Sequence, residues 1–486
     1  MSNVLDLVDQ TFFRLERAAG VGQCVWLYNR PVDIDGLRQF HQHLERGRLA
    51  RRIERSPLPF GRHRWVSPRD QHELEIATPR PREEFDTWLN EQANIPLDAQ
   101  HGPGWHLAVL PFTDGGTGVS FVVTHCLTDG IGGCLAMVEA ACGYDHTINW
   151  PAAGSRPRWR ALREDARQTA RDIPGIRRAL VAAAAAARSA RHRRRTARPA
   201  SSAFSNPPAL IAGADELVTF PTAAFFLDAD EWDARAQSLG GTSNTLLAGL
   251  AARLAQRVGR VAADGSVALA IPVNERTADD TRANAVTMAD ITVNPAPVTT
   301  DLREIRDATK QALIRHREVP DERRTLLPLV PLLPQRLIRR MVGVATGGAT
   351  NVVVASNIGA APSAANRPDG TDADHVALLS RYPGVTRAMI HQLGGLLVVH
   401  SARVDRQVFV SVLSYQPDRA NSNDELRQHV SSALGDFSLT ATAGWGCPKR
   451  ASGTAAQVDS FELYDLTTST SHRKSASENE QCTRLV

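Results

Sequence analysis

Short apolar runs alternate along this chain with stretches of helical periodicity. The clearest run, 119–123, is β-branched and apolar, which predicts a buried strand. His125 follows it directly, then Asp129 and glycines at 130, 132 and 133, before apolar residues recur with helical spacing. The pattern predicts a strand, a tight turn and a helix, in which the glycines allow backbone conformations that other residues resist. His125 is thereby placed at a strand end, where a substrate could reach it.

The remaining pattern predicts a mixed chain of strands and helices in two halves. In the first half it predicts strands at 24–28, 63–66 and 104–110 and helices at 34–49 and 81–93, with 104–110 pairing as a hairpin with 119–123. In the second half it predicts strands at 217–227, 267–273, 286–293, 351–357, 394–400 and 408–415, and helices at 230–239, 245–258, 302–315 and 423–434. Ser243 or Asn244 is a suitable N-cap for the helix at 245–258.

Composition changes sharply between the halves. Residues 156–198 hold fourteen arginines and three acids, a charge of +11, which leaves −7 for the rest of a chain whose net charge is +4. Pro174-Gly175 predicts a break between two helices, and 199–208 resembles a loose linker. The 486 residues therefore divide into a first lobe (1–150), an Arg/Ala-rich connection (151–212), a second lobe (213–450) and a polar tail (451–486) that we expect to be disordered.

Composition narrows the classes of protein. Hydrophobic residues make up 42% and charged residues 22%, as in soluble globular proteins. There is no uncharged apolar run of about 18 residues or more, and the N-terminus lacks the pattern of a secretory signal. The six cysteines have no metal-site spacing, so we expect reduced thiols in a cytoplasmic protein without a metal or a cofactor. The basic charge lies in one segment without interleaved aromatic residues, which argues against nucleic-acid binding.

His125 is the residue best suited to chemistry. A neutral imidazole accepts a proton from an attacking hydroxyl or amine near neutral pH, provided that its tautomer is fixed. Asp129, before a glycine in a turn, is better suited to holding the loop than to touching the imidazole. Cys126 is an unsuitable nucleophile because neighbours on an extended segment point to opposite faces. The plain alternative is a core histidine before an ordinary Asp-Gly turn, since this spacing arises by chance in roughly one such chain in twenty.

Several segments occur in a familiar order. The first is His125 to Gly130, which matches a His-x-x-x-Asp-Gly motif, with Thr124 where many relatives have a further His. The others are Leu7, Asp9, Phe12 and Glu16; Gly104-Trp105-His106-Leu107; Asn244 to Ala248; Pro272 to Arg276 with Asn284; and Ser356-Asn357. This order, over roughly residues 5–440, resembles the chloramphenicol-acetyltransferase and condensation-domain superfamily. Within it the chain looks most like the wax ester synthase/diacylglycerol acyltransferase family, although the segments of the second half match that family less closely.

The resemblance implies an α/β (α+β) fold of two similar lobes, each a mixed sheet flanked by helices, with the active-site channel between them. His125 would be the catalytic base, and Asp129 and Gly130 would shape its loop. We expect Asp129 to form an ion pair with Arg276 that joins the second lobe to this loop. Ser356 and Asn357 are candidates for holding the oxyanion, and Asn244 and Trp105 for contacting substrate.

The implied reaction is direct transfer of an acyl group from acyl-CoA to the hydroxyl of a lipid or other hydrophobic alcohol, as in wax ester or triacylglycerol synthesis, without an acyl-enzyme. Two alternatives stay open: a stand-alone condensation enzyme that uses a donor on an acyl carrier protein, and a non-catalytic relative that only binds an acyl ligand. The basic segment is read first as a solvated connection. It could also attract coenzyme A phosphates or a carrier protein, or rest on the inner membrane face or on lipid bodies.

Overall fold

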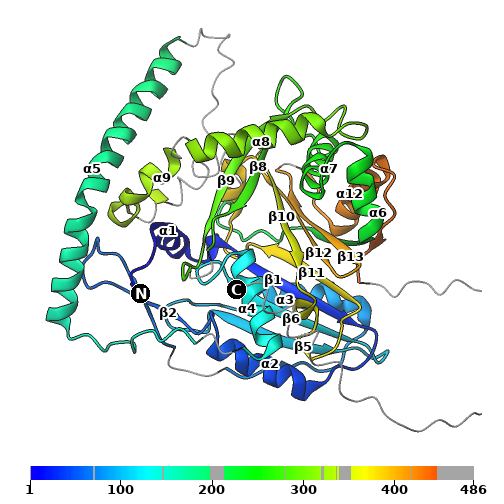
Figure 1. Ribbon diagram of the computed structural model, residues 1–486, viewed down its shortest axis with the longest axis horizontal. Coiled ribbons are helices and arrows are strands. Elements are labelled where there is room, and N and C mark those ends of the chain that lie inside the picture. Colours follow the sequence, from blue (N-terminus) through cyan, green and yellow to red (C-terminus); the bar gives the residue numbers. More distant parts are fainter. Residues whose placement is uncertain are drawn as a thin grey trace, which may run out of the picture.

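The computed structural model describes residues 2–68, 72–144, 147–196, 213–277, 280–318, 322–334, 337–338, 352–417 and 419–445. The predicted linker at 199–208 and the polar tail from 451 lie outside these residues. Two sheets dominate the molecule (Figure 1): a five-stranded sheet in the order β11-β1-β6-β5-β4, and a seven-stranded sheet in the order β14-β7-β13-β12-β10-β8-β9. The expected fold class, two lobes of mixed sheet flanked by helices, is confirmed.

The first lobe contains the predicted hairpin, and its turn lies at 112–116. Its strands are β1 (Val21–Tyr28), β4 (Glu75–Ile76), β5 (Trp105–Pro111) and β6 (Thr117–Thr124), beside a small ribbon of β2 (Arg52–Glu54) and β3 (Arg64–Val66). Its helices are α1 (Leu7–Leu15), the 3₁₀ turns η1 (Glu16–Ala19) and η2 (Arg82–Glu84), α2 (Ile34–Arg46), α3 (Phe85–Asn94) and α4 (Gly130–Cys142). Aromatic residues such as Trp26 and Phe121 fill the core of this lobe.

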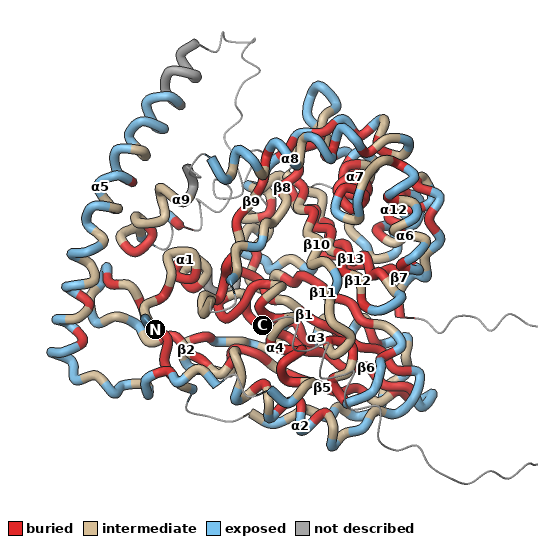
Figure 2. Tube along the Cα trace, in the orientation of Figure 1, coloured by how far each residue is buried: buried red, intermediate tan, exposed pale blue. Residues whose placement is uncertain are grey.

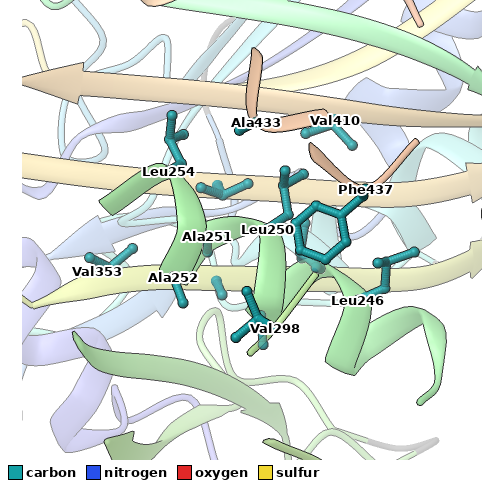
Figure 3. Close-up of a cluster of buried hydrophobic side chains, with 14 of the residues drawn as sticks. Leu246, Leu250, Ala251, Ala252, Leu254, Val298, Val353, Val410, Ala433 and Phe437 are labelled. Carbon is teal, nitrogen blue, oxygen red and sulfur yellow. The ribbon is translucent and has the colours of Figure 1, made fainter. Parts of the chain in front are cut away.

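The second lobe packs four of its helices on one face of the larger sheet, while the helix at Arg387–Gln392 packs on the other face. The strands are β7 (Thr222–Asp228), β8 (Val267–Asn274), β9 (Val286–Val293), β10 (Val353–Ala361), β12 (Leu396–Val404), β13 (Gln407–Tyr415) and β14 (Thr442–Ala443). The helices are α6 (Ala229–Ser238), α7 (Ser243–Arg257), α8 (Arg303–Glu318), α9 (Glu322–Leu326), α11 (Arg387–Gln392) and α12 (Asn423–Asp436), with 3₁₀ turns η3 (Leu327–Leu332) and η4 (Ser363–Asn366). Figure 3 shows α7 buried in this core, where Leu246 and Leu250 lie near Phe437.

One strand crosses between the lobes. β11 (His375–Arg381) comes from the second half of the chain but pairs antiparallel with β1, with Arg381 opposite Val21 and His375 opposite Leu27. The pattern of apolar residues did not predict this strand. The sequence division at residue 212 therefore does not separate the two sheets, because the first sheet is completed by residues that follow β10.

Two local predictions were wrong. Residues Arg158–Thr196 form one helix, α5, that continues through Pro174. Pro174 is exposed, so water can replace the backbone hydrogen bond that proline removes, and the next turn rests on η3, where Gly175 packs on Pro328. The N-cap of α7 is Thr242, which forms a capping box with Thr245, so the predicted caps Ser243 and Asn244 lie inside the helix. None of the helices in the described ranges is long and apolar enough to cross a membrane.

Candidate active site

His125 lies where β6 ends, in a turn between the lobes. Its backbone N–H donates to the Gly20 carbonyl over 3.3 Å, and its carbonyl accepts from the side-chain amide of Asn284 over 2.9 Å. The ring lies 5.8 Å from the ring of Phe12 on α1, measured between centroids, and the residue is partly exposed. His125 is thus held by β1, by α1 and by a second-lobe loop that includes Asn284.

The surroundings of His125 keep its ring neutral. Burial lowers the pKa of His125 below its ordinary 6.5, and the Asp129 carboxylate and the Thr128 backbone oppose this shift only in part. A neutral imidazole is the form that accepts a proton. The ring therefore has the protonation state that a general base requires at neutral pH.

Asp129 fastens residues 125–130, the candidate catalytic loop, to the second lobe. It is the N-cap of α4, and its Oδ1 accepts from the Gly132 N–H over 2.7 Å. Its Oδ2 accepts from Arg276 Nη2 and from the Ala285 N–H, each over 2.8 Å. The expected ion pair with Arg276 is thus present, and both side chains are almost fully buried. Arg276 also donates to the carbonyl of Ala283 over 2.9 Å, so the pair fixes the loop and leaves the imidazole to other contacts.

The glycines that follow Asp129 matter for close packing and not for backbone conformation. Gly130, Gly132 and Gly133 have no positive φ, so the expectation of unusual backbone conformations was wrong. A Cβ at Gly132 would lie 2.5 Å from Thr128 Oγ1 and 3.0 Å from Arg276 Nη2, whereas one at Gly130 would meet its nearest atom at 3.8 Å. Gly132 lets α4 approach the Asp129–Arg276 ion pair closely.

Asp9 on α1 forms a second link to the same loop. Its fully buried carboxylate accepts from the backbone N–H groups of Ala283 (3.0 Å) and Asn284 (2.8 Å) and from the Asn284 side chain (3.1 Å). Burial raises the pKa of Asp9 to about 6, although the Arg51 guanidinium and these hydrogen bonds act in the opposite direction. Because Asn284 also holds His125, the N-terminal helix, the catalytic loop and the second lobe meet at one point.

A second histidine lies in this region, and no motif or spacing in the sequence indicated it. His400 on β12 forms a 2.7 Å hydrogen bond through Nε2 with Ser380 Oγ on β11. Burial, and to a smaller extent His125, lower the pKa of His400 to about 4, so this ring is also neutral at pH 7. Its Nδ1 is buried and makes no hydrogen bond with any residue of the described ranges. His400 thus carries a polar atom that a substrate could satisfy.

The strand register places both histidines near one side of the first sheet. Val123, Gly22 and Ser380 lie opposite one another across β6, β1 and β11, so their side-chain positions share a face. His125 follows Val123 by two residues, in the turn after β6, and its effect on the pKa of His400 shows that the two histidines lie near each other. Between His125 and Ser380 the middle strand presents Gly20 and Gly22, which carry no side chains. A Cβ at Gly20 would lie 2.7 Å from the Tyr382 ring, which fills that position, whereas one at Gly22 would have only ordinary contacts.

The structure separates the other candidate residues. Ser356 is in register with His400 on the neighbouring strand, so it shares the face of the second sheet that bears His400. Asn357 points the other way: its amide donates to Ser243 over 3.4 Å and accepts from the Gly359 N–H over 2.8 Å. This arrangement does not support Asn357 as an oxyanion donor. Asn244 is exposed on the first turn of α7 and is not brought to the catalytic loop.

Trp105 lies inside the first lobe. It is buried among other rings, 5.0 Å from His41 and 6.0 Å from Phe121 between centroids, and it borders a cavity of about 480 Å³ that also reaches Leu127 in the catalytic loop. Arginines at 46, 51 and 52 line this cavity as well, while His125 does not. Trp105 therefore lies in the core of the first lobe, beside a cavity that reaches the His125 loop at Leu127, and not next to His125.

Cysteine and metal chemistry find no support around His125. Cys126 lies in the turn after β6 and is buried in the first-lobe core, in the same cluster as Val123, so the extended segment assumed in the prediction is not present there. Among the residues that the structure describes, no three His, Cys, Asp or Glu side chains gather as metal ligands.

Comparison with solved structures identifies the fold. The chain matches the condensation domain of the Monacolin K polyketide synthase MokA (TM-score 0.52, 13% identity, 90% of this chain and 97% of that one). It matches the first condensation domain of the CDA synthetase equally well (TM-score 0.52, 12% identity, 91% and 99%). A wax ester synthase/diacylglycerol acyltransferase from Marinobacter aquaeolei VT8 reaches a TM-score of 0.49 at 18% identity, over 90% and 98% of the two chains.

No family model and no curated protein matches the sequence. The two matches of TM-score 0.52 show that the chain has the two-lobed fold of condensation domains. The expected membership of the wax ester synthase/diacylglycerol acyltransferase family is not shown by these comparisons.

Proposed function

We propose that this protein is an acyltransferase that moves an acyl group from a thioester, acyl-CoA in the first instance, to the hydroxyl of a lipid or another hydrophobic alcohol. The observation that carries the proposal is His125: a neutral, partly exposed imidazole at the junction of two lobes, in a loop fixed by the ion pair of Asp129 and Arg276.

The reaction follows from the imidazole. The hydroxyl of the acceptor transfers its proton to a ring nitrogen of His125 while its oxygen attacks the thioester carbonyl carbon. The tetrahedral intermediate then collapses, the C–S bond breaks, and the thiolate leaves as a thiol with the proton from His125. An ester and a free thiol are the products. Hydrogen-bond donors at the oxyanion each accelerate such a step by about 100-fold to 1,000-fold. Ser356 and His400 are the candidates for this role.

A second candidate function is condensation with a donor carried on a protein, forming an amide or ester. It is favoured by the two solved structures of TM-score 0.52, which are condensation domains of a polyketide synthase and of the CDA synthetase. The chemistry at His125 would be the same, with an amine or alcohol as acceptor. The two functions differ in what carries the thioester and in whether an amine can replace the alcohol as acceptor.

The test is thiol release from acyl-CoAs of short to long chain, with and without alcohols and amines. The His125→Ala protein is the control, and the signal from the six cysteines of the chain is subtracted as background. Release that needs both the acceptor and His125 supports acyl transfer from CoA. Release only from acyl carrier protein thioesters selects the second function. Binding of acyl-CoA without turnover by any pair would contradict both and leave a non-catalytic acyl-binding protein.

A further inference from the structure

Helix α5 exposes an unusual number of large apolar side chains. Trp159 is 66% exposed, Leu162 42%, Ile173 43%, Leu180 54% and Val181 67%. They recur at helical spacing, with small alanines between them, so they form one row on the helix surface. From Trp159 to Val181 this row is roughly 33 Å long at 1.5 Å per residue. Figure 2 shows α5 largely exposed along the edge of the molecule.

The opposite side of α5 is held by the body of the protein. Ala161, Asp165 and Ala179 are buried there. The Asp165 carboxylate accepts from Arg64 over 2.9 Å, from Arg156 over 3.1 Å and from Ser56 Oγ over 2.7 Å. At about 100° per residue, the apolar row lies roughly 100–200° around the helix from Ala161 and Ala179 and begins roughly 60° from Asp165. The body therefore fixes which way the row faces: away from the protein.

Arginines flank the apolar row on the outward side. Arg163, Arg167 and Arg177 are exposed and lie roughly 160–240° around the helix from Ala161. The three acids of the helix are paired: Asp165 with Arg64 and Asp172 with Arg62 of the first lobe, and Glu164 with Arg160 on α5 and with Arg156 just before it. The outward face is thus apolar and cationic, without a competing negative charge in the described part of α5.

We propose that this outward face of α5, which we call the α5 stripe, rests on an anionic lipid surface. A straight row of apolar side chains with arginines beside it is the pattern by which a helix lies in a membrane interface. A convex single helix that stands at the edge of the molecule suits a flat, extended partner better than a partner with a deep pocket. The negative charge of the rest of the chain disfavours contact through other surfaces. This inference does not depend on the proposed enzymatic function.

Vesicle flotation tests the α5 stripe with the full-length protein. We expect the protein to float with vesicles of phosphatidylcholine and phosphatidylglycerol at low salt. It should not float with vesicles of pure phosphatidylcholine, and 0.5 M salt should release it from the anionic vesicles. The triple variant Arg163→Gln, Arg167→Gln and Arg177→Gln should lower the partition coefficient roughly a hundredfold, because each arginine near such a surface contributes about fivefold. The triple variant Trp159→Ser, Leu180→Ser and Val181→Ser should lower it by at least about tenfold.

The controls separate the stripe from general stickiness. Leu217→Ser combined with Ile76→Ser removes exposed apolar side chains (62% and 47% exposed) elsewhere and should leave binding unchanged. A blue shift of tryptophan emission on adding anionic vesicles should disappear in Trp159→Phe, although seven of the eight tryptophans remain. Vesicle binding that survives both triple variants would overturn the proposal. The proposal would also be overturned if the protein did not bind anionic vesicles and the substitutions in the α5 stripe instead abolished self-association, measured by light scattering, or the binding of an acidic carrier protein.

Discussion

At the scale of single residues, the protonation state of His125 sets the pH dependence of any reaction that it catalyses. Burial holds the pKa of His125 below 6.5, and only the neutral ring accepts a proton. We expect kcat/KM to be constant above neutral pH and to fall tenfold per pH unit on the acid side, with a midpoint below 6.5. A pH profile measured with a non-ionising substrate checks this. A midpoint above 7 would show that another group controls the rate.

His400 has an equally specific expectation. Its neutral ring is anchored by Ser380 and presents a buried nitrogen without a described partner. If that nitrogen bonds to the reacting carbonyl, His400→Ala should lower kcat by about a hundredfold. Ser380→Ala should have a smaller effect, because it frees the ring and does not remove it. His375→Ala is the matched control, since His375 is also partly buried on β11 but bonds to Gln407. Equal losses in His375→Ala and His400→Ala would point to a purely structural role.

Site residues were predictable from the sequence where they lie in one segment or in an ordered set of segments. His125 and Asp129 follow one strand, and the ion pair with Arg276 was expected from the order of the segments. Ser356 and Asn357 show the limit: both are polar at a strand end, but alternation sends them to opposite faces. His400 and Ser380 meet only through the pairing of β11 with β1, which no local pattern encodes.

At the scale of elements, the first turn of α4 has room for a methyl group at Gly133 but not at Gly132. We expect Gly132→Ala to lower the free energy of unfolding by about 1–3 kcal/mol, because its Cβ would crowd Thr128 and the Asp129–Arg276 pair. Gly133→Ala is the control. Its Cβ would meet only Thr128, at an ordinary 3.6 Å, and alanine favours a helix, so its stability should be unchanged or raised by up to about 1 kcal/mol. Urea unfolding of the two variants makes the comparison, and equal effects would contradict the steric argument.

Elements with strong local patterns were predicted, and those decided by distant contacts were not. The hairpin of β5 and β6 has an apolar run on each side of an Asp-Gly-Gly turn. β11 is seven residues long, among Asp, Gly and Pro, and its partner β1 is more than 340 residues away. The continuity of α5 at Pro174 likewise depends on its contact with η3.

At the scale of the whole molecule, Asp129 joins the lobes, and its loss should differ from the loss of His125. Asp129→Ala leaves the buried Arg276 cation without its carboxylate, which costs about 3–5 kcal/mol. We expect the variant to unfold at lower temperature and to lose activity, whereas His125→Ala stays folded and inactive. Calorimetry alongside the thiol assay distinguishes the two. A folded Asp129→Ala protein with near-normal turnover would contradict this assignment.

Asp9 should make the stability of the assembled molecule depend on pH. Its pKa is raised to about 6 in the folded protein from an ordinary 3.8, so the folded state binds the proton more tightly than the unfolded chain does. The resulting stabilisation is complete below about pH 3.8 and is lost as the pH rises through about 6. Relative to Asp9→Asn, the wild-type free energy of unfolding should fall by up to about 3 kcal/mol between pH 4 and pH 7. Chemical denaturation across this range measures the difference, and parallel curves would refute it.

The pairing of β11 with β1 also determines when the first lobe can be completed on the ribosome. About 250 residues separate the end of β6 from the start of β11, and at 5–20 residues per second they take roughly 12–50 s to synthesise. Throughout that time the apolar strand β1 has one open edge, which is a template for pairing with other nascent chains. We therefore expect the yield of native protein in a reconstituted translation system to rise when a chaperone that shields exposed strands is added.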